Sequence, residues 1–127
     1  MVKRISPTVK IANNDKVSFS FSNLKPLSYV DAVSDGSFFI GYLQRLSKLS
    51  QLGWSSIYTS PRHAYGSENL PVESLNERAK NQVPQELTNL MVLRVDSKNH
   101  AFLGYREGNV FQVLFIEHNF GEIYKHE

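Results

Sequence analysis

Three stretches near the C-terminus carry apolar residues in the short runs that are typical of β-strands. They read LMVLRVD, HAFLGYR and NVFQVLFI, and the turn-prone triplets SKN and EGN separate them. Gly108 and Asn109 suit the positive φ angles of a tight hairpin loop. The third stretch is apolar on both faces, which predicts a central strand. Since consecutive strands usually pair, we expect a three-stranded antiparallel meander between residues 90 and 116.

The stretch KVSFSFSN alternates with a period of two, with Val17, Phe19 and Phe21 on one side and serines on the other. This pattern predicts a half-buried strand near the N-terminus.

The stretch SDGSFFIGYLQRLSKLSQLG follows the period of a helix instead. Its apolar positions at spacings of three and four predict one buried stripe. That stripe comprises Phe39, Tyr42, Leu43, Leu46 and Leu49. Asp35 or Ser37 can cap the start of the helix, and Gly53 can end it.

Between this helix and the meander, Pro61, Gly66, Pro71 and Pro84 interrupt every pattern. Residues 54–59 and 72–81 are expected to form short helical turns, and the rest to be loop. An insertion as long as 59–88 is often functional or mobile in a small domain.

This order of elements predicts an α+β fold in a single domain over residues 1–127. The expected architecture is a small twisted antiparallel sheet, made of the N-terminal strand and the C-terminal meander, with one or two helices packed on one face. The tail after the last strand is expected to fold back over the edge of the sheet.

Composition agrees with a folded chain and names no partner. Hydrophobic residues make up 41% of the 127 residues, the net charge is only +2, and there is no cysteine. The start, MVKRISPTVK, lacks the apolar core of a signal peptide, and no apolar run is long enough to cross a membrane. We expect a cytoplasmic protein without a membrane contact.

The order of the elements, together with VLRVDSKNHAFLGYREGNVFQVLFI and HNFGEIYKH, resembles the RelE/ParE-like toxin superfamily. The resemblance implies a RelE-like α+β domain held in check by an antitoxin protein. For the ribonuclease members it further implies cleavage of mRNA, usually on the ribosome, by attack of a 2′-hydroxyl on the next phosphate. That chemistry needs a proton acceptor, a proton donor and cations, but no metal or other cofactor.

Five residues match the roles that this resemblance implies. Arg94 and Arg106 are the candidate cations around the phosphate. His118, Tyr124 and His126 are the candidate acid and base groups, because an imidazole titrates near neutral pH.

Other basic residues are candidates for RNA binding. Arg45 and Lys48 fall on the expected outer face of the helix, and Arg62 and His63 belong to the loop PRHAYGSE. No histidine spacing typical of a metal site is present, and neither is a P-loop or a GxSxG motif.

Structural roles compete with these catalytic ones. His118 can simply end a strand, Tyr124 can anchor the C-terminus, and Arg94 can pair with an acid such as Asp96 or Glu117, since a buried unpaired guanidinium is costly. A different class of function is also open: a non-catalytic protein-binding module on the same fold, such as a phage or host-defence accessory protein. The modest net charge favours that class. A non-toxin enzyme centred on residues 62–68 is a third alternative.

Overall fold

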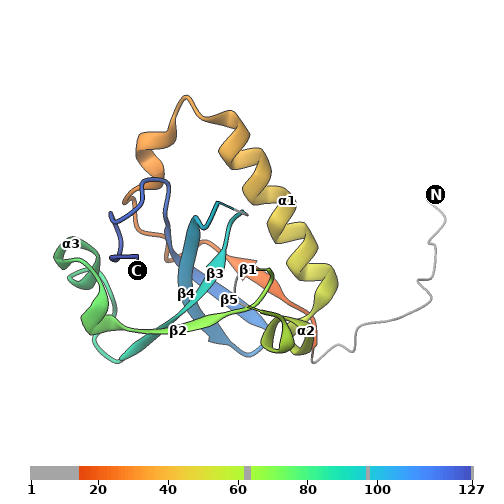
Figure 1. Cartoon of the computed structure of the whole chain (residues 1–127). Coiled ribbons are helices and arrows are strands. Elements are labelled where there is room, and N and C mark those ends of the chain that lie inside the picture. Colours follow the sequence, from red (N-terminus) through yellow and green to blue (C-terminus); the bar gives the residue numbers. More distant parts are fainter. Residues whose placement is uncertain (1–14, 62–63, 97, 127) are drawn as a thin grey trace, which may run out of the picture.

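The computed structural model describes residues 15–61, 64–96 and 98–126 (Figure 1). Five strands form one open mixed sheet in the order β1-β5-β4-β3-β2, and the predicted α+β class is confirmed. The strands are β1 (Ser18–Ser20), β2 (Glu68–Pro71), β3 (Asn89–Arg94), β4 (Ala101–Glu107) and β5 (Val110–Ile116). The helices are α1 (Gly36–Leu52), α2 (Trp54–Thr59) and α3 (Glu77–Lys80), with 3-10 turns η2 (Tyr29–Ala32) and η3 (Val72–Ser74).

The C-terminal meander has the predicted form. Strands β3, β4 and β5 pair antiparallel in sequence order, and Gly108 takes a φ of 63° in the last hairpin. Strand β5 lies between β4 and β1, as its two apolar faces predict. Strand β1, however, pairs with β5 in parallel, with Phe19 opposite Phe111. The expectation of a wholly antiparallel sheet is therefore corrected. Strands β1 and β5 are the first and the last of the described strands, so no hairpin joins them and no turn fixes their relative direction.

Residues Glu68–Pro71 form an edge strand, β2, where the sequence predicts loop. Strand β2 runs antiparallel to β3, with Leu70 opposite Leu90. It has only four residues and ends in a proline, so it lacks the alternating pattern of a longer strand, and an edge is where a sheet tolerates proline.

Helix α1 begins and ends where the sequence predicts. The Asp35 side chain accepts hydrogen bonds from the Phe38 backbone N–H (3.1 Å) and the Ser37 hydroxyl (2.9 Å), and Gly53 ends the helix with a φ of 84°. The buried stripe is rotated from the predicted one, since Leu43 is 65% exposed. The buried residues of the helix are Phe38, Tyr42, Leu46 and Leu49. No helix in the described ranges is both long and apolar enough to span a membrane.

The sheet separates two buried clusters, and Figure 1 shows α1 on one side and α3 with the C-terminal tail on the other. We call these sides the helix face and the tail face. On the helix face, α1 and α2 pack against residues such as Phe102 and Phe111. On the tail face, Leu75 and Ala79 pack with Ile123 and Tyr124 of the tail. The prediction of helices on one face holds for α1 and α2, but the shorter α3 packs on the opposite face.

A bulge in β5 decides which side chains reach which face. Leu103 lies opposite Phe115 while Gly104 lies opposite Val113, so that Leu114 is an extra residue in β5. The bulge brings the strands so close at Gly104 that a Cβ there would lie 1.9 Å from the Gln112 carbonyl oxygen. After a one-residue insertion every later side chain changes face. Glu117 consequently points to the tail face and His118 to the helix face.

The tail folds back over the sheet, as the sequence predicts. The Ser28 hydroxyl accepts hydrogen bonds from the backbone N–H groups of His118 (2.8 Å) and Asn119 (3.2 Å), which fixes the turn after β5. The Asn76 backbone N–H donates to the Ile123 carbonyl at 2.8 Å. Ile123 and Tyr124 are buried, so the tail completes the second core.

Candidate functional site

A polar hollow of about 430 Å³ opens on the tail face, and we call it the tail hollow. Strands β2 and β3, turn η3 and the C-terminal tail contribute its walls. The hollow is lined by Glu68, Leu70, Ser74, Arg94, Asn99, Tyr124, Lys125 and His126. Three of the five residues that the sequence singles out for catalysis, Arg94, Tyr124 and His126, therefore meet in one place.

Arg94 is the buried cation of the tail hollow, with only 5% of its surface exposed. Its Nη1 donates to the Tyr124 hydroxyl at 3.0 Å, and its Nη2 donates to Glu68 Oε2 at 2.8 Å. The expectation that Arg94 pairs with an acid is therefore right in kind, but the acid is Glu68. Because Glu68 balances its charge, Arg94 serves chiefly to hold Tyr124 in place.

Tyr124 combines the anchoring role with a position in the hollow. Its ring is buried, and this burial raises the pKa of its phenol while the neighbouring Arg94 opposes the rise. The phenol is consequently protonated at neutral pH. Since Arg94 donates to the phenolic oxygen, the hydroxyl proton of Tyr124 is left to be donated to another group.

His126 is held by a carboxylate that lies beneath the hollow. Its Nε2 lies 2.8 Å from both carboxylate oxygens of Glu117, and its ring lies 4.3 Å from the Tyr124 ring, centroid to centroid. Glu117 is completely buried; burial raises its pKa, and the hydrogen bond with His126 opposes the rise. With Nε2 donating to Glu117, the lone pair of a neutral His126 is on Nδ1.

The sequence analysis missed Glu117 as a site residue and considered it only as a partner of Arg94. A signal was present, because Glu117 directly follows the most apolar strand of the chain. A carboxylate drawn into a core in this way needs a hydrogen-bonding partner, and a histidine on a returning tail is a natural one.

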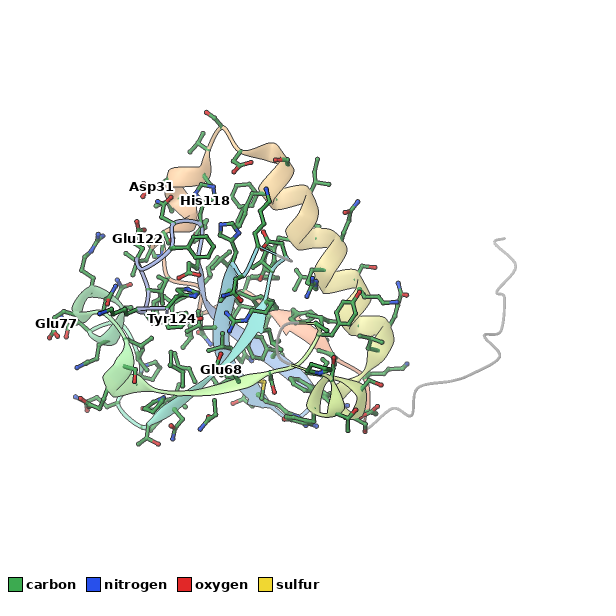
Figure 2. The ribbon with its side chains drawn as sticks, viewed as in Figure 1. Asp31, Glu68, Glu77, His118, Glu122 and Tyr124 are labelled. Atoms are coloured by element: carbon green, nitrogen blue, oxygen red, sulfur yellow. The ribbon has the colours of Figure 1, made fainter. Side chains whose placement is uncertain are left out.

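His118 lies apart from the tail hollow, on the helix face. Its Nε2 lies 2.9 Å from Asp35 Oδ2, its ring packs edge-on against Phe38 at 4.8 Å, and its Nδ1 is buried without a partner. In the view of Figure 2, His118 lies at the end of the molecule that carries η2, whereas Tyr124 and Glu68 lie closer to β2. Neither ring nitrogen of His118 is therefore accessible to a substrate, because one is bound to Asp35 and the other is buried.

Arg106 lies toward the other end of the sheet. Its guanidinium stands 4.3 Å from the centre of the Trp54 ring and donates to the Tyr58 hydroxyl at 3.2 Å. Arg106 lies five positions along β4 from Ala101, the partner of Arg94, which is roughly 17 Å at the usual rise of a strand. Arg106 is thus a structural cation of the β4–β5 hairpin and not part of the tail hollow.

Of the four candidates for RNA binding, Arg45 and Lys48 lie on the helix face. The Arg45 guanidinium donates to the Ala64 carbonyl at 2.9 Å and covers the Tyr65 ring at 4.8 Å, and Lys48 approaches the same ring at 5.9 Å. Both side chains hold the loop after α2 and do not flank the tail hollow. Arg62 and His63 lie outside the described residues.

The tail hollow brings together groups that suit proton transfer. His126 offers a lone pair, Tyr124 a proton and Lys125 a positive charge, all next to one another in the tail. In the part of the chain that the structure describes, no group of three or more His, Cys, Asp or Glu residues is arranged to hold a metal ion.

Comparisons of the chain with protein-family models, with curated proteins and with solved structures found no match.

Proposed function

We propose that the protein is a RelE-like toxin that cleaves mRNA without a metal ion, and that the tail hollow is its active site. The proposal includes action in the cytoplasm, on RNA that is free or on the ribosome, and an antitoxin protein as its inhibitor. The observation that carries the proposal is the meeting of Arg94, Tyr124 and His126 in one hollow, with His126 held by the buried Glu117.

In the proposed reaction, His126 Nδ1 accepts the proton of a ribose 2′-hydroxyl. The 2′-oxygen then attacks the neighbouring phosphorus, and the bond from phosphorus to the 5′-oxygen breaks. The products are a 2′,3′-cyclic phosphate and a free 5′-hydroxyl. Glu117 orients the imidazole through Nε2 and stabilises the imidazolium that forms, as carboxylates do in other general-base pairs.

Tyr124 donates its proton to the departing 5′-oxygen in this reaction. Lys125, which lines the same hollow, stabilises the negative charge that gathers on the phosphate. Arg94 acts through Tyr124, since its guanidinium donates to the Tyr124 hydroxyl and to Glu68. Arg94 is accordingly a positioning residue.

Induced expression in a bacterial host, followed by growth measurement and RNA profiling, tests the proposal. The wild-type protein should arrest growth and produce new RNA ends, and both effects should vanish in His126→Gln and weaken in Tyr124→Phe. Arg94→Ala is a poorer probe because it removes both the ion pair with Glu68 and the hydrogen bond to Tyr124, and so destabilises the fold. Growth arrest that persists unchanged in His126→Gln would remove the tail hollow from the mechanism.

A non-catalytic protein-binding module is the second candidate function, favoured by exposed apolar side chains on α1 and just before it. Val33 is 87% exposed, Ile40 59% and Leu43 65%, and the last two are neighbours on α1. For such a module, a charged double variant (Ile40→Lys with Leu43→Glu) should end growth arrest while His126→Gln should leave it unchanged. If the protein instead acts by catalysis at the tail hollow and no antitoxin is present, His126→Gln should end growth arrest and the double variant should leave it unchanged.

A further inference from the structure

Phe120 is a large apolar side chain that the tail presents to solvent. It is 54% exposed, although it lies between buried segments of the tail. One face of its ring stacks on the His100 imidazole, with 4.5 Å between centroids and 12° between planes. The His126 ring lies 5.2 Å away at 84° to it. The Phe120 ring is thus supported by two histidine rings while about half of its surface stays exposed to solvent.

The tail turn holds Phe120 in this position. Gly121 takes a φ of 81°, and its carbonyl accepts a hydrogen bond from the Asn76 side chain. The backbone N–H of Glu122 donates to the Asn119 carbonyl at 3.2 Å. These contacts connect the turn to the segment before α3, so the ring is preorganised and does not need a ligand to order it.

A second hollow of about 420 Å³ lies directly against the Phe120 ring. Its lining residues are Asn76, Phe120, Gly121, Lys125 and His126. Two of these, Lys125 and His126, also line the tail hollow. The Phe120 ring and the proposed acid–base group His126 therefore lie next to each other, and Lys125 lines both hollows with His126.

We propose that this second hollow binds a nucleobase of single-stranded RNA by stacking on Phe120, with the phosphate of that strand at Lys125 and His126. The inference rests on the proposed function and names the form of its substrate: an unpaired strand whose base can be splayed out. Single-stranded nucleic acids are bound in this way by aromatic platforms beside cations, and each stacked base contributes about 1–3 kcal/mol. Stacking of this kind tolerates all four bases.

Binding of RNA that cannot be cleaved tests the inference separately from catalysis. The probes are short fluorescent oligoadenylates with 2′-O-methyl riboses, and the same oligonucleotide with abasic positions, both measured by fluorescence anisotropy. Phe120→Ala should weaken binding of the oligoadenylate about 10-fold or more, since it removes one stacking platform. Phe120→Trp should retain the wild-type affinity, and the abasic probe should bind the wild type as weakly as the oligoadenylate binds Phe120→Ala.

Phe21→Ala is the matched control, because Phe21 is an exposed phenylalanine that packs on Tyr42 of the helix face. It should bind the oligoadenylate like the wild type. Equal affinities of wild type and Phe120→Ala, or no binding by the wild type, would overturn the inference. If the wild type binds through Phe120 but cleaves no RNA, the inference stands and the proposed reaction fails. If the wild type cleaves RNA and Phe120→Ala binds the oligoadenylate normally, the proposed reaction stands and the inference fails.

Discussion

The described residues form three histidine–carboxylate pairs, of which His100–Asp96 lies beside the β3–β4 turn. The other two lie on opposite faces of the sheet, and neighbouring residues of the chain, Glu117 and His118, belong to different pairs. In both pairs a histidine Nε2 lies within 2.9 Å of a carboxylate oxygen. The two carboxyl groups nevertheless respond in opposite directions. Burial raises the pKa of Glu117, whereas the hydrogen bond from His118 lowers the pKa of Asp35, whose side chain is 41% exposed. The exposure of the carboxylate, and not its partner, decides the direction.

The two histidines differ in the nitrogen that remains. His118 Nδ1 is buried without a partner against the helix face. His126 instead lines two hollows. Its Nε2 is bonded to Glu117, so Nδ1 is the nitrogen that can bind a substrate. The helix-face pair therefore stabilises the start of α1, while the tail-face pair has an atom with which to act on a substrate.

The largest expected effect comes from exchanging each histidine for glutamine. His126→Gln should lower the rate of RNA cleavage about 10²- to 10⁴-fold, the usual contribution of a general base. His118→Gln should change the rate little, because Nε2 of His118 is engaged by Asp35 and Nδ1 is buried. Rates measured on one labelled RNA compare the two variants directly, and an equal loss in both would erase the distinction between the pairs.

Gly104→Ala should abolish the bulge that separates the pairs. The new Cβ would lie 1.9 Å from the Gln112 carbonyl oxygen, so the strands must move apart at a cost of about 3 kcal/mol. Gly41→Ala is the control, because nothing lies within 4 Å of a Cβ there and alanine favours a helix by about 1 kcal/mol. Chemical denaturation measures both, and a Gly104→Ala protein as stable as the wild type would contradict the close approach.

The next largest effect is expected in the pH dependence of stability, which should differ between Glu117 and Asp35. Because the folded-state pKa of Glu117 is raised, the folded protein binds the extra proton more readily than the unfolded chain. The stability that this proton contributes is present below the unfolded pKa, about 4.3, and is lost as the pH rises through the folded-state pKa. The stability difference between the wild type and Glu117→Gln should therefore fall with rising pH in that range, as urea denaturation can follow. A stability difference that rises with pH in that range would contradict a raised pKa of Glu117.

Asp35→Asn should give the smallest effect, with the opposite slope. The lowered pKa of Asp35 contributes stability above the unfolded value, about 3.9, and this stability is lost as the pH falls through the folded-state pKa. Asparagine is also a good N-cap, so the variant removes the charge and preserves the cap. Added salt should shrink the difference from the wild type, since the carboxylate is exposed. A difference insensitive to both salt and acid would show that the ion pair contributes nothing.

Local patterns in the sequence were sufficient for the parts of the fold that depend on neighbouring residues. They predicted the three strands of the meander, the limits of α1 and a cap at either Asp35 or Ser37, of which the structure has Asp35. They did not predict the parallel pairing of β1 or the short edge strand β2, because both depend on partners distant in sequence. The exposure of Leu43 has the same origin, since tertiary contacts rotate the helix toward Phe38.

The candidate site was predictable only in part for a related reason. Arg94, Tyr124 and His126 were singled out because they match the roles that the resemblance implies, but the bulge at Leu114 decides which residues share their face. Without the bulge, strict alternation would turn Glu117 to the helix face with Val113. The sequence shows a glycine in β4 but not that an extra residue stands opposite it, so the role of Glu117 and the separation of His118 could not be foreseen.

End-group analysis of RNA exposed to the purified protein is the most direct measurement of the central claim, which is that His126 removes a 2′-hydroxyl proton in the tail hollow. The reaction is run in EDTA, and the fragments are analysed by mass spectrometry. The account predicts fragments with 2′,3′-cyclic phosphate and 5′-hydroxyl ends from the wild type, and intact RNA with His126→Gln. Fragments with 5′-phosphate ends, or the same fragments at the same rate from His126→Gln, would contradict it.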